Sequence, residues 1–140
     1  MSATDHHLAH RPPAPPVLLL ASASPRRREL LWQIGVPHVI AAAAIDERQR
    51  PGETPSDCVG RLALAKARTL WRGELPVLGA DTAVVVDGQM QGKPGTRDAA
   101  LATLARLSGR THEVLTAVAL LDGRGSALRL SRSEVRFREL

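Results

Sequence analysis

Apolar runs and helix-like amphipathic segments alternate along most of this chain, and each run predicts an element. The first run, residues 17–21 (VLLLA), has the length and composition of a buried strand. Ser24 and Pro25 then predict the N-cap and first position of a helix. Gly35 predicts its end, and its apolar side is formed by Leu30, Leu31 and Ile34. A short polar loop thus joins a strand to a helix N-terminus, an arrangement whose N–H groups can face an anion.

The second apolar run covers residues 36–44 and shows little alternation, which predicts a buried strand containing His38 as a satisfied strand residue. Polar residues 45–54, with a Pro-Gly pair, predict a loop leaving this strand. Thr54 and Pro55 then predict the cap and first position of a second helix. The apolar stripe of this helix comprises Val59, Leu62, Ala63, Ala67 and Leu70.

Lys66 falls on that same stripe. An ammonium group on an inward face costs free energy unless its stem snorkels to water or its head meets a negative partner. The spacing leaves both explanations open. Lys66 and Lys93 are the two lysines of a chain whose 19 cationic side chains are otherwise arginines, and their rarity makes both of them candidate residues.

Residues 76–95 contain two strand-like runs that flank Asp81, and Asp87-Gly88 is typical of a hairpin turn. The pattern does not place Asp81 on a solvated surface. It caps a bulge or turn, or it serves a ligand at the carboxyl end of a strand. Lys93 lies in a Gly-Lys-Pro-Gly loop, where a solvated turn lysine is ordinary.

The C-terminal part predicts a third helix and a hairpin. Thr96 caps the helix and Gly109 ends it, and one face carries Leu101, Leu104 and Ala105. Residues 112–121 and 127–140 predict two strands joined at Asp122-Gly123. In the second of these strands Val135 and Phe137 alternate with arginines, as in a half-buried strand. Strands and helices interleave, and we therefore predict an α/β fold.

The composition narrows the function classes. The net charge of +5 suits an anionic partner, but the chain has no Tyr, one Phe and two Trp. Stacking on bases is thus poorly supplied, and we predict no nucleic-acid partner. The single cysteine, Cys58, excludes an internal disulfide and fits a reducing, cytoplasmic compartment. Its position on an apolar helix predicts a packing role.

The N-terminal residues 1–16 lack periodicity and end in prolines, which predicts a disordered leader before a domain over residues 17–140. His6, His7 and His10 are expected to be solvated there. The LLLASA stretch is similar to a signal-peptide core, but its apolar run is too short and PRRR follows at once. No run approaches the roughly 18 apolar residues of a membrane span, and we predict no membrane partner.

Clustered arginines mark the candidate site. Arg26, Arg27 and Arg28 fill the first turn of the first predicted helix, where they oppose the helix dipole by about 0.3–1 kcal/mol per group. That cost is explained if a multiply charged ligand, such as a phosphate chain, binds there. Metal-assisted chemistry at phosphorus also needs carboxylates, and the candidates at predicted strand ends are Asp46, Glu47 and Asp81. The chain lacks the P-loop and dinucleotide-binding fingerprints.

Five segments in order resemble the Maf family of nucleoside triphosphate pyrophosphatases: ASASPRRRELL, IDERQRPGE, RLALAKA, LGADTAVVVDGQMQGKP and LARLSGRTHEVLTAVAL. The resemblance implies hydrolysis between the α and β phosphates, with Mg²⁺ or Mn²⁺ and a nucleoside triphosphate substrate. It implies Asp81 as the proton acceptor and Glu47 beside it at the metal. Phosphate contacts are implied for Ser22, Ser24, Arg27, Lys66 and Lys93. Arg26 and Thr82 match positions for base choice and imply a dTTP/UTP branch.

The resemblance further implies a Maf-like (ITPase-like) mixed sheet flanked by helices, a homodimer and a link to septum formation. Family members continue with segments resembling Asp-Lys-Ala-Gly and Tyr-Gly-Ile-Gln-Gly, whereas this chain stops at Leu140. We therefore expect the C-terminal lobe to be largely missing from this sequence. The alternative to an active enzyme is a catalytically impaired nucleotide-binding remnant of the same family.

Overall fold

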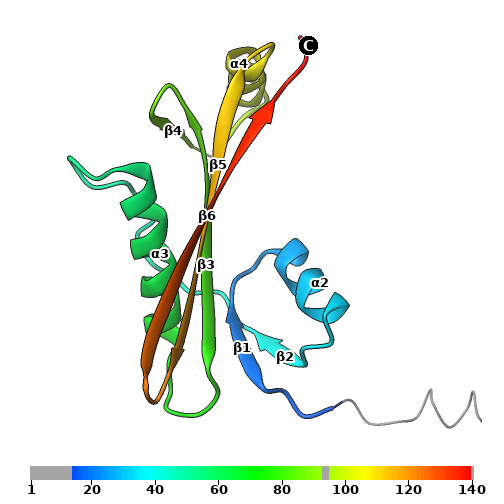
Figure 1. Cartoon of the computed structure of the whole chain (residues 1–140), viewed down its shortest axis with the longest axis vertical. Helices are drawn as coiled ribbons and strands as arrows, with labels where there is room; N and C mark the ends of the chain where they lie inside the picture. Colours follow the sequence, from blue (N-terminus) through cyan, green and yellow to red (C-terminus); the bar gives the residue numbers. More distant parts are fainter. Residues whose placement is uncertain (1–13, 93–94, 140) are drawn as a thin grey trace, which may run out of the picture.

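A mixed six-stranded sheet organises the computed structural model, which describes residues 14–92 and 95–139 (Figure 1). The strands are β1 Leu18–Ala21, β2 His38–Ile40, β3 Val77–Val86, β4 Gln89–Gln91, β5 Thr111–Asp122 and β6 Gly125–Arg136. The helices are α2 Pro25–Gln33, α3 Pro55–Leu70 and α4 Arg97–Leu107. The strand order is β2-β1-β3-β5-β6, and β4 pairs with β3. The predicted α/β fold with a mixed sheet flanked by helices is confirmed.

Helices α2, α3 and α4 begin where their capping residues predict. The hydroxyl oxygens of Ser24, Thr54 and Thr96 each accept a hydrogen bond from the backbone N–H three residues later. Gly35 follows α2 with a φ of 74°, as a helix stop should. These local signals need no tertiary information, which is why the sequence reveals them.

Helix α3 lies against one face of β3 and β5, and α2 lies on the other side of the sheet beside β1 and β2 (Figure 1). The predicted stripe of α3 faces the sheet: Val59, Leu62, Ala63 and Ala67 are buried and Leu70 is half-buried. Small residues of both layers pack together in the core, which includes Ala63, Ala83, Ala117 and Ala119. Because the layers are close, a long α3 side chain on the inward face reaches the sheet directly.

The second apolar run was predicted wrongly as a long buried strand. Its regular part is β2, three residues long, and Val39 and Ile40 are 43% and 46% exposed. The reason is position, because β2 is an edge strand that pairs only with β1 among the described strands. His38 is buried and its Nδ1 lies 2.9 Å from the carbonyl oxygen of Val36, although its Nε2 has no partner in the described part.

The two runs around Asp81 form one continuous strand, β3, of ten residues. Asp81 therefore lies in the middle of a strand. The predictions that it lies at the end of its own strand, or caps a bulge, were wrong. The predicted hairpin turn at Asp87-Gly88 is confirmed, and both residues have positive φ.

The C-terminal hairpin forms as predicted, but Asp122 pairs with Gly125, which places the turn one residue later, at Gly123-Arg124. Val135 is half-buried as predicted, whereas the rest of β6 is exposed because β6 is an edge strand. Several apolar side chains predicted on inward helix faces are exposed instead: Leu30, Ile34, Leu101 and Leu104. The predicted leader falls largely outside the described residues, and the predicted loop position of Lys93 lies outside them as well.

Candidate functional site

A gap in strand pairing creates the candidate site. One edge of β3 pairs with β5 along Val77–Val85. The other edge pairs with β1 over residues 77–79 and with β4 over residues 84–86, which leaves residues 80–83 without a strand partner on that side among the described residues. Asp81 and Thr82 lie in this gap, just past the carboxyl end of β1. The prediction that ligand-binding groups gather at a carboxyl strand end thus holds for β1, which runs parallel to β3.

Lys66 joins two carboxylates at this gap. Its Nζ lies 3.0 Å from Asp81 Oδ1 and 2.8 Å from Glu47 Oε1, and it also donates to the carbonyl oxygen of Ala80 at 3.3 Å. The side chains of Lys66 and Asp81 are 12% and 14% exposed, whereas that of Glu47 is 51% exposed. The sequence left two explanations open for Lys66, a stem that snorkels to water or a negative partner for its ammonium group. The structure supports the second explanation.

Arg27 is held by two hydroxyl groups from different elements. Its Nη1 donates to Ser22 Oγ at 3.1 Å and its Nη2 donates to Thr82 Oγ1 at 3.0 Å. Ser22 Oγ also accepts from the backbone N–H of Ser24 at 3.1 Å, which shapes the loop between β1 and α2. The guanidinium is thus oriented before a ligand arrives, as bidentate recognition of a phosphate requires.

Thr116 is a neighbour of the site that the sequence did not single out. It lies on β5 directly opposite Thr82, and the two Oγ1 atoms are 3.2 Å apart. The pairing register decides this contact, and a single sequence does not contain the register. The threonine pair becomes recognisable only once β3 and β5 are aligned.

Two adjoining cavities, of about 280 and 360 Å³, unite the predicted residues. Ser24, Arg27, Glu47 and Lys66 line both of them. Ser22 lines the first and Asp81 and Thr82 line the second, beside Met90, which the sequence did not indicate. The structure therefore brings together the following predicted site residues: Ser22, Ser24, Arg27, Glu47, Lys66, Asp81 and Thr82.

Two other candidates, Arg26 and Asp46, lie away from these cavities, and a third is not among the described residues. Arg26 is exposed and lines neither cavity. Asp46 forms an ion pair with Arg48 and lines a separate cavity, so the structure does not bring it together with Glu47 and Asp81. Lys93 lies outside the described residues.

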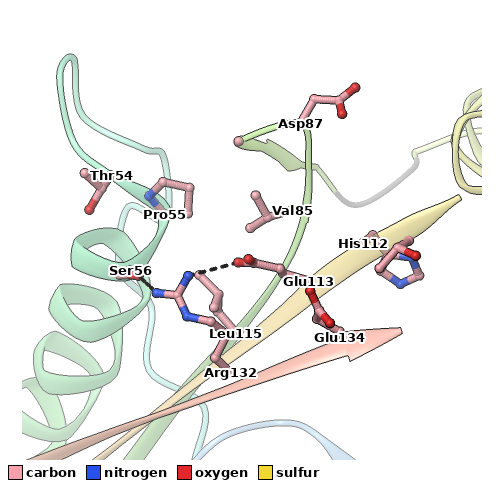
Figure 2. A pocket seen from close by; sticks show the side chains of 12 residues that line it. Thr54, Pro55, Ser56, Val85, Asp87, His112, Glu113, Leu115, Arg132 and Glu134 are labelled. Carbon is pink, nitrogen blue, oxygen red and sulfur yellow. Dashed lines mark hydrogen bonds and ion pairs between the residues drawn. The ribbon is translucent and has the colours of Figure 1, made fainter. Parts of the chain in front are cut away.

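A larger cavity, of about 510 Å³, lies between the start of α3 and the β5–β6 hairpin (Figure 2). Arg132 there donates to Glu113 Oε2 at 3.0 Å and to Ser56 Oγ at 3.1 Å. Glu134 pairs directly opposite Glu113 and Asp87 also lines this cavity, and an anionic ligand would therefore meet three carboxylates there. The chemistry of the smaller cavities, with Arg27 and Lys66, suits a phosphate chain better than this larger one does.

Comparison with known proteins decides the family. The Maf family profile, described as "Maf-like protein", matches residues 17–140. The chain belongs to the Maf family. A relative named dTTP/UTP pyrophosphatase from Burkholderia pseudomallei (strain 1710b) is 48% identical, over 91% of this chain and 68% of its own. A Hahella chejuensis relative of the same name is 51% identical, over 88% of this chain and 64% of its own. This Maf chain spans about two thirds of the length of these relatives.

Two solved structures share the fold of this Maf protein. A HAM1 protein from Coxiella burnetii superposes with a TM-score of 0.54 at 17% identity, covering 85% of this chain and 71% of its own. The Staphylococcus aureus Ham1 protein gives 0.55 at 13% identity, covering 85% and 70%. At this identity the likeness concerns the fold alone, and it agrees with the predicted ITPase-like sheet.

Cys58 packs in the interior of the fold, on α3. Cys58 is buried, and burial is the main cause that raises the pKa of its thiol, as expected of a packing residue.

Over residues 14–92 and 95–139, none of the helices has the length and apolar character needed to cross a bilayer.

An ion pair between Arg61 and Glu53 closes the loop that carries Glu47, and it strongly lowers the pKa of Glu53. Hydrogen bonds from Arg61, and then from the backbone of Arg50, lower the pKa of Glu53 from 4.5 to about 2. The native pKa lies below the unfolded one, and this carboxylate therefore stabilises the fold above about pH 4.5 and loses that contribution as the pH falls toward 2.

We therefore expect Glu53→Gln to lower the free energy of unfolding at pH 7, with a difference from the parent that shrinks between pH 5 and pH 2. Urea unfolding followed by circular dichroism over this pH series measures the effect. Glu74→Gln, at an exposed glutamate, is the matched control and should track the parent. A Glu53→Gln difference that is constant with pH would contradict the prediction.

Proposed function

We propose that this Maf protein hydrolyses nucleoside triphosphates between the α and β phosphates, releasing a monophosphate and pyrophosphate. dTTP and UTP are the proposed substrates, supported by the names of relatives that are 48% and 51% identical. The observation that carries the proposal is Lys66, placed between the carboxylates of Glu47 and Asp81 in a cavity that Arg27 also lines. Cations there suit the phosphate chain, and a carboxylate beside them suits proton transfer.

Glu47 and Asp81 fit a divalent metal. Both carboxylates lie within 3.0 Å of one Nζ, and Mg²⁺ is usually held by one or two carboxylates together with substrate phosphates and water. The described residues contain no group of three or more His, Cys, Asp or Glu side chains arranged to hold a metal, so substrate and water would complete the coordination. A bound Mg²⁺ or Mn²⁺ would supply Lewis-acid polarisation and charge neutralisation.

Asp81 is the proposed proton acceptor. The hydrogen bond from Lys66 orients its carboxylate, which takes a proton from the attacking water. The water oxygen bonds to the α phosphorus, and the bridging oxygen leaves with pyrophosphate. Arg27 and Lys66 bind phosphate oxygens and stabilise the charge that develops on them. Lys93 is proposed to add a further phosphate contact, and Arg26 and Thr82 are proposed to act in base choice.

Three finer proposals rest on the family resemblance and on composition. We propose a cytoplasmic location, a homodimer and a role linked to septum formation. A nucleic-acid partner is not proposed, because the aromatic side chains that stack on bases are scarce in this chain.

Pyrophosphate release tests the function directly. Protein first shown to unfold cooperatively is assayed with dTTP, UTP, 7-methyl-GTP and the common nucleotides, in Mg²⁺ and in Mn²⁺. Turnover of dTTP and UTP above the others is the expected result. Nucleotide binding without turnover would overturn the proposal for this chain and support the nucleotide-binding remnant instead.

Arg27→Lys is expected to raise KM for dTTP about ten- to a hundredfold, because a charged hydrogen bond contributes about 1.5–3 kcal/mol and lysine lacks the planar fork. Steady-state kinetics measure the change. Arg28→Lys, one residue later on the exposed side of α2, is the control and should leave KM unchanged. An equal effect of both variants would argue against a specific role for Arg27.

A further inference from the structure

The segment that carries Glu47 lacks regular secondary structure. Residues 45–54 form an irregular loop with a turn at Pro51-Gly52, and about half of the Glu47 side chain is exposed. Burial therefore does not hold this carboxylate, yet it lies 2.8 Å from Lys66 Nζ. Besides this ion pair, hydrogen bonds at other residues of the loop fix its path.

Arg61 of α3 supplies such contacts. Its Nε lies 2.6 Å from Glu53 Oε2 and its Nη2 lies 2.9 Å from Glu53 Oε1. The same Nη2 donates to the carbonyl oxygen of Arg48 at 3.0 Å, next to Glu47 in the chain. The side chains of Arg61 and Glu53 are 22% and 11% exposed, which shields the pair from water and from salt.

Glu53 extends this contact over the rest of the loop. Its Oε1 accepts a hydrogen bond from the backbone N–H of Arg50 at 3.0 Å, and its carbonyl oxygen accepts one from Gln49 Nε2 at 2.7 Å. The backbone of Arg48 and of Arg50 is therefore tied to the ion pair itself, and the Gln49 side chain is tied to the backbone of Glu53. That pair is anchored on α3, the helix that also carries Lys66.

We propose that Arg61 is a positioning residue which, through Glu53 and the carbonyl group of Arg48, holds Glu47 at the metal-binding side of the site. The inference rests on the proposed function for the role of Glu47 in metal binding, whereas the loop contacts stand by themselves. A lysine at position 61 keeps the charge but cannot make the bidentate and carbonyl contacts together. Partners that orient a metal ligand typically change metal affinity 10–100-fold when they are altered.

The test compares Mn²⁺ binding, followed by electron paramagnetic resonance, in the parent, Arg61→Lys, Glu47→Gln and the double variant. Arg61→Lys is expected to weaken Mn²⁺ binding about tenfold. It should add no further loss in the Glu47→Gln background, because both changes remove the same ligand. Arg68→Lys, at an exposed position of α3, is the matched control and should bind as the parent does. Independent, additive losses in the double variant would overturn the proposal.

Amide hydrogen exchange of residues 46–53 separates this inference from the proposed function. If Glu47→Gln does not alter Mn²⁺ binding, the metal assignment fails, and the positioning role is then judged by exchange alone. Arg61→Lys should speed exchange in this loop while the β3–β5 core keeps its protection. Unchanged exchange in the loop would overturn the inference. Glu53→Gln, which breaks the same pair from the loop side, replaces Arg61→Lys if that variant does not fold.

Discussion

Replacing Asp81 by asparagine should remove most pyrophosphate release while the fold remains. The substitution keeps the size and shape of the side chain but removes the basic oxygen that would accept a proton. Positioned proton transfer contributes about 10²–10⁴-fold to rate, and we expect kcat for dTTP to fall by that factor. Lys66 keeps Glu47 as a partner in the variant, and an unpaired buried ammonium is thereby avoided.

The measurement combines steady-state kinetics with nucleotide binding and thermal unfolding of the same preparation. Binding of dTTP should persist in Asp81→Asn, because Arg27 and Lys66 remain in the cavity. Asp98→Asn, at an exposed position in the first turn of α4, is the control and should turn over as the parent does. Parent-like turnover in Asp81→Asn would assign the proton acceptor to another group.

The sequence predicts the beginnings of the helices and the inward stripe of α3, but it mispredicts the burial of several other apolar side chains. A cap such as Ser24 or Thr54 acts on backbone groups three residues away, and the local sequence therefore contains the whole interaction. Burial depends on which elements pack against an apolar side chain. Ile40 and Leu101 have the right character for a core, but they lie on an edge strand and on an outer helix where little covers them.

In the candidate site, too, the sequence indicates some features and not others. Family resemblance indicates Asp81, Lys66 and Glu47, and the structure brings these three together. The contacts that position them come from strand register and from loop closure, which no motif in a single sequence contains. Thr116 meets Thr82 only because β5 pairs with β3 in one register, and Arg61 reaches Arg48 only because the loop folds back on α3.

Gly79→Ala should be the most destabilising single-methyl change among the glycines of the described residues. A Cβ at Gly79 would overlap the carbonyl oxygen of Ala63 and would lie 2.9 Å from the backbone nitrogen of Ala67. Both obstacles are backbone atoms of α3, and neither can rotate away. Overpacking of a core costs about 1–3 kcal/mol of stability and occasionally more. We expect Gly79→Ala to lower the free energy of unfolding by about 3 kcal/mol or more. Urea unfolding measures it.

Gly92→Ala is the matched control, because a Cβ there would meet nothing within 4 Å. It should leave stability unchanged or slightly raised. The close approach at Gly79 also bears on the site, since α3 carries Lys66 while β3 carries Asp81. A methyl group that pushes α3 from β3 should lengthen the contact between Lys66 and Asp81. We therefore expect turnover per folded molecule to fall as well, and a destabilised variant with parent-like kcat would show that the site tolerates this shift.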